Sequence, residues 1–337
     1  MSSALCLFYR MEVLIMADLI SHWLLGKRIL NDDSFAEAYP FLDREAFLWG
    51  CQGPDILFFH RMMPWQSGSL RSYGSSIHKG DPAAVLRSLA KICRYCADRQ
   101  DYALILSYSM GFCCHYCYDR LVHPLVHYNI ELLEKTDERG NNYNYHALIE
   151  NNYDLMLLKQ EKGLSINDLD INECLPECRG FDKAAALLYS LLLCDLYGVH
   201  TPIKLSMTLA EDFRSAVKLR KDSLFIKKPV AELAERLLPY VRPGVKGGAL
   251  ACRFYTKNYD TGFDYANITN SVGFDPRDKS FRSNASFFDL TSMAQFESKA
   301  LIDIFVEDVT HKGCGDFESF TGGVNFSGIK WDMVENK

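Results

Sequence analysis

The chain has 337 residues, of which 48% are hydrophobic and 24% charged, so it can bury a large core as one large domain or two ordinary ones. Its formal net charge of −6 argues against a general nucleic-acid binder, which would present a basic face. We therefore expect no specific nucleic-acid partner, whereas acidic metal ligands are compatible with this charge.

The N-terminus does not have the pattern of an export signal. Arg10 and Glu12 interrupt its two short apolar runs, whereas a secretory signal needs a continuous apolar segment. The most apolar later stretch, 183–198, is too short to span a bilayer and carries charges. We expect a cytoplasmic protein and interpret residues 1–15 as a disordered or mis-assigned N-terminal extension.

The first half of the chain shows the hydrophobic period of helices. A first helix is predicted over 17–30, and Asp81 and Pro82 are typical of the N-cap and first residue of another. The segment 101–123 is apolar on most faces, as in a central buried helix. Because proline cannot donate to the helical ladder, Pro124 is predicted to end or kink this helix near His123.

The second half is also predicted to be helical, apart from one irregular stretch. The expected helices are 145–161, 181–198, 203–220, 229–240 and 288–308. The segment 250–286 has weak periodicity and predicts long loops or a short hairpin. The sequence thus predicts an all-α protein, a multi-helix bundle. Residues 16–160 are expected to form a metal-binding helical core, on which residues 161–337 pack within the same domain.

Two histidine–carboxylate pairs have the spacing that puts both side chains on one helical face. They are His115 with Asp119 and His146 with Glu150. Two such pairs on facing helices can surround metal ions inside a bundle. Imidazole and carboxylate ligands suit zinc, with iron or manganese as alternatives.

For His115 and Asp119, burial favours a bound metal over an ordinary hydrogen-bonded pair. A single pair of this kind is more often an ordinary hydrogen-bonded pair. Asp119, however, lies in an otherwise apolar helix, where a buried carboxylate is costly unless a cation compensates it. Asp55 and His78, both expected in loops, could complete the ligand set.

The cysteines offer a rival zinc site. Twelve cysteines without an export signal suggest reduced thiols. Cys93-x2-Cys96 and Cys114-x2-Cys117 fit the spacing of a four-cysteine zinc site. Both pairs fall inside predicted helices rather than tight turns, so buried free thiols are the favoured interpretation.

An ordered set of motifs resembles the zinc-dependent phospholipase C family, which shares its metal architecture with fungal single-strand nucleases. The motifs are Ser21-His22, Gln52-Gly53-Pro54-Asp55, Ile77-His78, Gly111…His115-x3-Asp119-x3-His123-Pro124 and His146-x3-Glu150. The resemblance covers roughly residues 16–155 and implies an all-helical fold of that type, with a metal cluster in its core.

The resemblance also implies which residues bind two or three zinc ions. The first ion is expected to take His78, His115 and Asp119; the second, His123, His146 and Glu150; the third, His22 and Asp55, with Asp119 as a bridge. Asp55 is also the implied catalytic residue, which handles the proton of the attacking water. His127 is either the alternative to His123 or a support for the site. In the secreted bacterial members of the resembled family, an N-terminal amine exposed by cleavage helps to bind the third ion. No such cleavage site is evident in this sequence, so the third ion is expected to bind weakly or to be absent.

The implied function is a zinc-dependent hydrolase that cleaves a phosphodiester by metal-activated water. A phospholipase C-like activity on a phospholipid is expected, with a small-molecule or lipid phosphodiester as substrate. The basic residues of 203–220 could make a peripheral contact with an anionic membrane. One alternative is a non-catalytic zinc-binding member with a structural or interaction role. The other is a single-strand nuclease-like phosphodiesterase.

Overall fold

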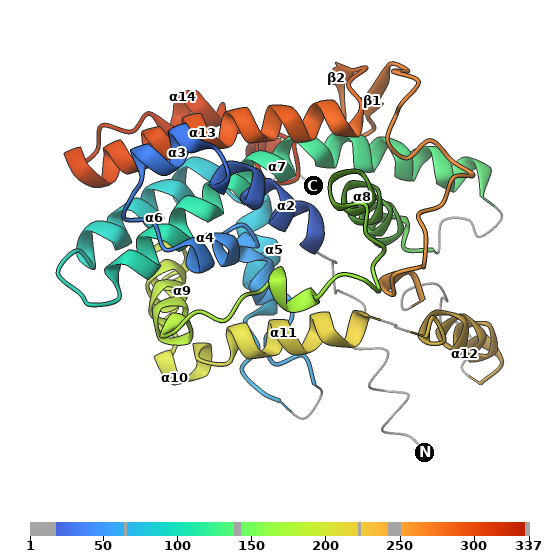
Figure 1. Cartoon of the computed structure of the whole chain (residues 1–337), viewed down its shortest axis with the longest axis horizontal. Helices are drawn as coiled ribbons and strands as arrows, with labels where there is room; N and C mark the ends of the chain where they lie inside the picture. Colours follow the sequence, from blue (N-terminus) through green and yellow to red (C-terminus); the bar gives the residue numbers. More distant parts are fainter. Residues whose placement is uncertain (1–17, 64–65, 138–142, 222–223, 242–250, 334–337) are drawn as a thin grey trace. The chain divides into compact units, whose positions relative to one another are not determined.

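A computed structural model describes residues 18–63, 66–137, 143–221, 224–241 and 251–333. The predicted extension over residues 1–15 lies outside them. Helices dominate the described chain (Figure 1). The α-helices are α2 Leu19–Leu30, α3 Asp33–Ala38, α4 Arg44–Gly50, α5 Arg71–Lys79, α6 Pro82–Tyr95, α7 Tyr102–Thr136, α8 Tyr145–Lys162, α9 Phe181–Tyr197, α10 Ile203–Ser206, α11 Leu209–Arg220, α12 Lys227–Val241, α13 Phe287–His311 and α14 Phe317–Thr321.

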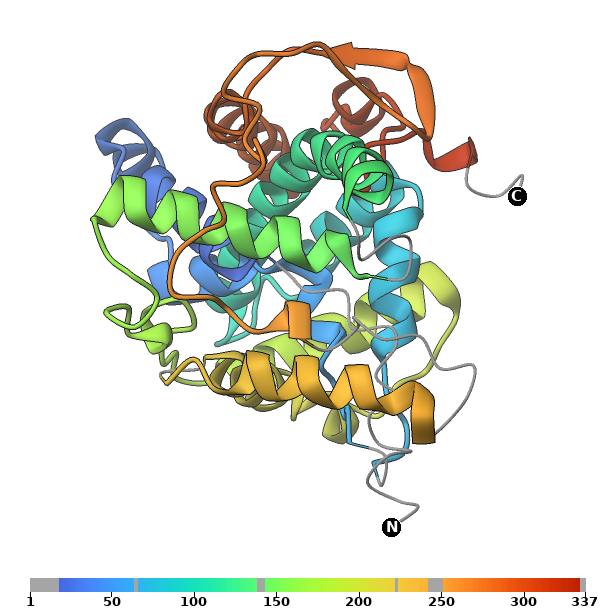
Figure 2. The same ribbon diagram turned by 90° about the vertical axis from the view of Figure 1, so that its right-hand side faces the viewer.

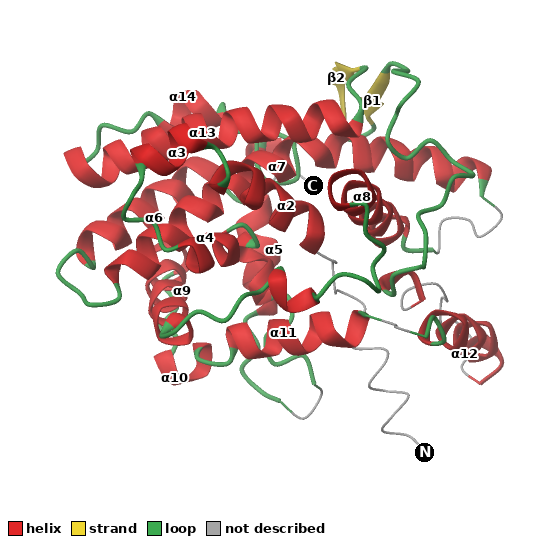
Figure 3. Cartoon of the chain, in the orientation of Figure 1, coloured by secondary structure: helices red, strands yellow, loops and turns green. Residues whose placement is uncertain are grey.

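The other elements are short. The 3-10 helices are η1 Gly53–Leu57, η3 Ile171–Glu173, η4 Ala251–Arg253 and η5 Trp331–Met333. Strands β1 Gly273–Asp275 and β2 Asp278–Ser283 pair antiparallel, which confirms the hairpin expected in 250–286 (Figures 2 and 3). The all-α prediction is confirmed. None of the described helices is both long enough and apolar enough to cross a membrane.

Side-chain caps fix where several helices begin. Asp81 accepts a hydrogen bond from the backbone N–H of Ala83, and Pro82 follows it as the first residue of α6, as predicted. Asp43 caps α4 in the same way through the N–H of Ala46. The short helices α3, α4 and α5 were not predicted, because fewer than ten residues hold too few turns for a clear hydrophobic period.

Two predicted helices have a different extent in the structure. The predicted end of α7 near His123 is wrong, because the helix continues through Pro124 to Thr136, whereas the alternative of a kink at Pro124 stays a prediction. Proline removes one helical hydrogen bond, but its neighbours Val122 and Val126 are fully buried, so packing holds the helix on both sides. The predicted helix 203–220 is divided into α10 and α11.

The chain divides into two compact units. Among the described residues, the first comprises 18–21 and those within 124–171 and 215–289; the second comprises those within 22–123, 172–214 and 290–333. In the first unit, the rings of Tyr153 and Phe287 stack 3.9 Å apart. The carboxylate of Asp154 accepts hydrogen bonds from Ser21 and Tyr255. These contacts tie together segments that are far apart in the sequence.

In the second unit, α4 and α7 cross with their backbones in contact. A Cβ added to Gly50 would lie 2.1 Å from the carbonyl oxygen of Tyr108, and one added to Gly111 would lie 2.1 Å from that of Phe47. Any side chain at either glycine would therefore push the helices apart. This crossing brings η1, which follows α4, against the middle of α7.

Candidate metal centre

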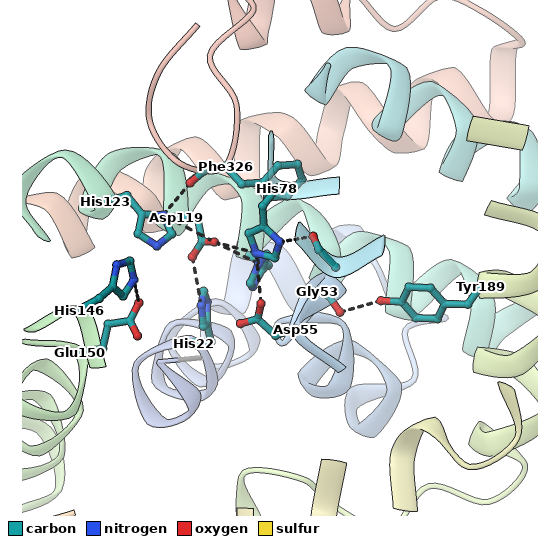
Figure 4. A network of polar contacts seen from close by, with 12 residues as sticks. His22, Gly53, Asp55, His78, Asp119, His123, His146, Glu150, Tyr189 and Phe326 are labelled. Carbon is teal, nitrogen blue, oxygen red and sulfur yellow. Dashed lines mark hydrogen bonds and ion pairs between the residues drawn. The ribbon is translucent and has the colours of Figure 1, made fainter. Parts of the chain in front are cut away.

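Asp119 lies at the centre of a ring of imidazoles in the second unit (Figure 4). Its Oδ1 is 3.2 Å from Nε2 of His22, on α2. Its Oδ2 is 3.2 Å from Nε2 of His115, one turn earlier on α7, and 3.4 Å from Nε2 of His78, on α5. Nδ1 of His123, one turn later on α7, lies 3.8 Å from Oδ2. The two carboxylate oxygens thus face different imidazoles, which is the arrangement of a bridging ligand.

Asp55 joins this ring from η1. Its Oδ1 lies 3.1 Å from Nε2 of His78, and it lies close enough to His22 and His115 for the three to hold one ion. The prediction that Asp55 and His78 lie in loops is wrong, because η1 carries Asp55 and the last turn of α5 carries His78. These helices hold the two side chains more rigidly than loops would.

Gly53 and two buried tyrosines shape the turn that carries Asp55. Gly53 has a φ of +49°, and a Cβ there would lie 2.4 Å from the ring of His115. The hydroxyls of Tyr108 and Tyr189 both donate to the carbonyl oxygen of Gly53, at 2.8 and 2.7 Å. These two contacts fix the start of η1 against the histidine.

His78 is oriented by its own helix. Its Nδ1 donates to the carbonyl oxygen of Gly74 at 2.7 Å, so Nε2 is the nitrogen directed at Asp55 and Asp119. The ring of Phe58 stacks on His78, with centroids 5.3 Å apart. A Cβ at Gly74 would lie 2.9 Å from the ring of Phe58, so the glycine leaves room for Phe58 to stack on His78.

A turn near the C-terminus completes the ring, and the sequence analysis did not identify it. The carbonyl oxygen of Phe326 accepts a hydrogen bond from Nδ1 of His123 at 2.7 Å. The Phe326 ring is fully buried against His78 and His115. Asn325, also fully buried, donates to the carbonyl of Lys79. No pattern in the sequence links this turn to histidines some two hundred residues earlier.

The remaining predicted ligands lie on α8 in the first unit. Nε2 of His146 is 2.6 Å from Oε1 of Glu150, as their spacing predicted. The ring of His127 lies 5.7 Å from that of His146. His123 belongs to the other unit, so the second zinc ion, and the choice between His123 and His127, stay predictions.

Burial and charge act in opposite directions on the ionisation of this centre. Burial lowers the pKa of His115 despite nearby Asp119, so its imidazole is neutral and able to bind a metal. Burial opposes the charge on His78, but hydrogen bonds and charges from Asp119 and Asp55 outweigh it and raise its pKa to about 10. Burial also opposes the charge on Asp119, yet the surrounding histidines hold its pKa well below the usual range.

The donor atoms fit zinc. A tetrahedral ion with bonds of about 2.0–2.2 Å sets its donor atoms roughly 3.3–3.6 Å apart. Nε2 of His78, Nε2 of His115 and Oδ2 of Asp119 form a triangle with sides of 3.4, 3.2 and 3.4 Å. His22 and His115 both turn Nε2 to the centre, and their buried Nδ1 atoms have no hydrogen-bond partner among the described residues.

The cysteines do not form the rival site. No disulfide joins two of the eleven described cysteines, and eight of these residues are buried. Burial raises the pKa of Cys93 to about 12, and it also raises the pKa of Cys114 and Cys117. In the metal-free chain these buried thiols hold their protons, as free cysteines in a core do. Within the described chain, the candidate metal groups contain only histidine and carboxylate.

Comparison with known proteins gives one match. A family model described as zinc dependent phospholipase C matches residues 21–189, half of the chain. This region contains every ligand predicted from the sequence, from His22 to Glu150. No curated protein and no solved structure matches the chain significantly.

Proposed function

Because this chain belongs to the zinc-dependent phospholipase C family, we propose that it is a hydrolase that cleaves the phosphodiester bond of a phospholipid with the help of bound zinc. The observation that carries the proposal is the triangle of donor atoms from His78, His115 and Asp119, whose sides are close to those of a face of a zinc tetrahedron.

The proposed ligand sets follow the sequence prediction. His78, His115 and Asp119 hold one ion, and His22 and Asp55 hold another, with Asp119 bridging the two. His123, His146 and Glu150 hold a further ion. Bound zinc would lower the pKa of a coordinated water towards neutrality and neutralise charge on the phosphoryl oxygens.

Asp55 is the proposed proton acceptor. Its carboxylate lies beside His78 and within the same cluster as His22 and His115, so it would orient the attacking water and take its proton. An imidazole must be neutral to bind metal, so zinc has to displace the proton that Asp55 and Asp119 hold on His78, and hydrolysis should decline as pH falls.

The free cysteines support a cytoplasmic location. No disulfide joins two of the eleven described cysteines, and most of these residues are buried. Free thiols persist in reducing compartments, where glutathione and thioredoxin keep disulfides rare. We propose that the protein works there.

Two substitutions at the centre test the proposed function. Metal content and hydrolysis of a soluble phosphodiester are measured for the purified chain, with and without chelator. We expect bound zinc and chelator-sensitive turnover. Asp55→Asn should suppress turnover, because Asp55 accepts the proton of the attacking water. It should keep more metal than His115→Ala does. His200→Ala, at an exposed site outside the ring, is the matched control.

The same experiment separates the alternatives. Bound zinc without turnover on a panel of phosphoesters would favour a non-catalytic role and overturn the proposal. Faster hydrolysis of single-stranded DNA than of phospholipid micelles would favour a nuclease, although the net charge of −6 argues against it.

A further inference from the structure

Arg61 and Arg71 are partly buried arginines of the second unit whose guanidinium groups have no partner among the described residues. The Nε atom of each is buried and has no hydrogen-bond partner there. Burying a charge without a partner is costly. Three other partly buried arginines of the described chain each pair with a carboxylate, Arg94 with Asp308, Arg120 with Glu297 and Arg277 with Asp275. Arg61 and Arg71 thus lack the counter-charge that the fold gives to these three.

Hydrogen bonds around His60 bring the backbone at Arg61 next to the backbone at Arg71. The N–H of Leu70 donates to Nδ1 of His60 at 3.0 Å, and the hydroxyl of Ser69 donates to the carbonyl oxygen of His60 at 2.8 Å. The same hydroxyl oxygen accepts from the backbone N–H of Arg71 at 3.4 Å. The two arginine side chains therefore start from adjacent points of the chain, where α5 begins.

His60 holds these two segments together and adds no charge of its own. It is fully buried, and its Nε2 donates to the carbonyl oxygen of Leu205 on α10 at 3.0 Å, while Nδ1 accepts from Leu70. A ring with one donating and one accepting nitrogen is neutral. Burial also lowers the pKa of His60. The positive charge at this place therefore comes from the two guanidinium groups.

The backbone of Arg61 has an unusual conformation. Its φ is +50°, in the left-handed region that residues other than glycine rarely adopt. Asp212 on α11 stabilises it by accepting the backbone N–H of Arg61 at 2.9 Å, and the same carboxylate oxygen accepts from the hydroxyl of Thr208. Asp212 is thus bonded to backbone and hydroxyl and not to a guanidinium. Strained backbone of this kind concentrates at ligand sites, where the fold holds a side chain in one direction.

The surroundings of Arg71 favour a negatively charged ligand. Burial lowers the pKa of Arg71, and among the described residues no charge offsets this effect. Arg71 is also the first residue of α5, and no side chain caps this end of the helix. The partial positive charge of a helix N-terminus adds to that of the guanidinium. An anion at this place would supply the counter-charge that the described residues do not.

We propose that Arg61 and Arg71 together bind a terminal phosphate group, that of inorganic phosphate or of a soluble phosphate monoester. Two guanidinium forks suit its three free oxygens and its charge of nearly −2. The site is separate from the metal centre, because Arg71 and His78 are seven residues apart on α5, about 10 Å along the helix axis. The inference goes beyond the proposed hydrolysis and does not depend on it.

Calorimetric titration of the full chain tests the proposal, with inorganic phosphate and glycerol 2-phosphate as separate probes. We expect both to bind. Arg61→Gln and Arg71→Gln should each weaken binding about tenfold or more, because each removes charge-assisted hydrogen bonds. Dimethyl phosphate, a diester with one charge and two free oxygens, should bind about tenfold more weakly than the monoester. Tighter binding of the monoester than of inorganic phosphate would identify an organic phosphate as the ligand, and the reverse order would identify free phosphate.

Two control variants locate the bound phosphate. Arg179→Gln changes an exposed arginine of the same unit and should bind phosphate like the parent. His115→Ala, which weakens the metal centre, should also keep phosphate binding. Phosphate that binds zinc alone would instead be lost in His115→Ala and kept in both arginine variants, and this result would overturn the proposal.

Thermal unfolding separates loss of the site from loss of the fold. Without phosphate, Arg71→Gln should melt no lower than the parent, because it removes a partly buried charge that has no partner. Phosphate should raise the Tm of the parent but not that of Arg61→Gln/Arg71→Gln, and sodium chloride at the same ionic strength should not replace it.

Three further results would overturn the proposal. The first is a parent that binds neither phosphate probe, and the second is dimethyl phosphate that binds as tightly as the monoester. The third is an Arg71→Gln variant that melts well below the parent without phosphate, since groups of the protein would then already pair with this guanidinium.

Discussion

Gly53 tests whether the turn before Asp55 sets the position of His115. Gly53→Ala adds a Cβ within 2.4 Å of the His115 ring and forces a non-glycine residue to a φ of +49°. The ring cannot stay in place, so we expect weaker zinc binding although every ligand is retained. Zinc content after dialysis against a competing chelator measures the effect.

Gly163→Ala is the matched control. Gly163 also has a positive φ, +67°, but nothing lies within 4 Å of the added Cβ. It should cost about 1–2 kcal/mol of backbone strain and leave zinc binding unchanged. Equal zinc loss in the two variants would mean that strain, and not the contact with His115, is responsible.

His78 makes the stability of the zinc-free chain depend on pH. Its pKa rises from 6.5 to about 10 in the folded chain, because Asp119 and Asp55 outweigh the effect of burial. Between these values the folded state binds the proton that the unfolded state has lost, so the free energy of unfolding falls as pH rises. The contribution is complete below pH 6.5 and lost above about 10. Urea unfolding in chelator over this range measures it.

His78→Asn should remove this dependence, whereas His200→Asn, at an exposed position, should keep it. The difference in unfolding free energy between parent and His78→Asn isolates the histidine from other groups that titrate in alkali. A difference that stays constant from pH 6.5 to 10 would contradict the assignment.

The sequence identified the candidate ligands but not the residues that position them. His115 with Asp119 and His146 with Glu150 were found because helical spacing alone puts each pair on one face. Tyr189 could not be found in this way. A buried tyrosine looks like any other core residue, and its hydrogen bond to a distant carbonyl depends on tertiary structure.

At the level of elements, the turn near the C-terminus that contains Phe326 packs against the candidate metal centre. Phe326→Ala removes a fully buried ring that packs on His78 and His115. We expect a loss of about 3–5 kcal/mol in stability, together with weaker zinc binding, because both imidazoles lose a neighbour that fixes them. Urea unfolding and zinc titration measure the two effects.

Phe317→Ala provides the comparison. Phe317 is equally buried in the same unit, where it packs near Phe305. Its loss should destabilise the chain to a similar extent but leave zinc affinity unchanged. If both variants lost zinc equally, the Phe326 ring would have only a general packing role.

The long helices were predictable, and the element boundaries were not. Hydrophobic period and the pair Asp81-Pro82 located α6, and period alone located α8. Pro124 misled the prediction for α7, since proline lowers local helix propensity while burial of Val122 and Val126 outweighs it. Local sequence reports propensity, whereas packing decides where a long helix ends.

At the scale of the whole molecule, the candidate centre connects segments that are distant in the sequence. His22 lies on α2, Asp55 on η1, His78 on α5 and Asp119 on α7. No disulfide between described cysteines ties these segments together. A metal ion would perform that role, because binding to a site that exists only in the folded chain adds its free energy to folding.

Zinc should therefore raise the unfolding temperature of the whole chain. A thousandfold excess of free zinc over its Kd adds about 4 kcal/mol, and each kcal/mol raises Tm by roughly 2–4 °C in a domain of 150–250 residues. Circular dichroism melts over a series of buffered zinc concentrations measure the slope. Asp119→Asn should flatten it, whereas Asp154→Asn, a buried carboxylate held by Ser21 and Tyr255, should not. A Tm independent of zinc in the parent would show that no ion binds this centre.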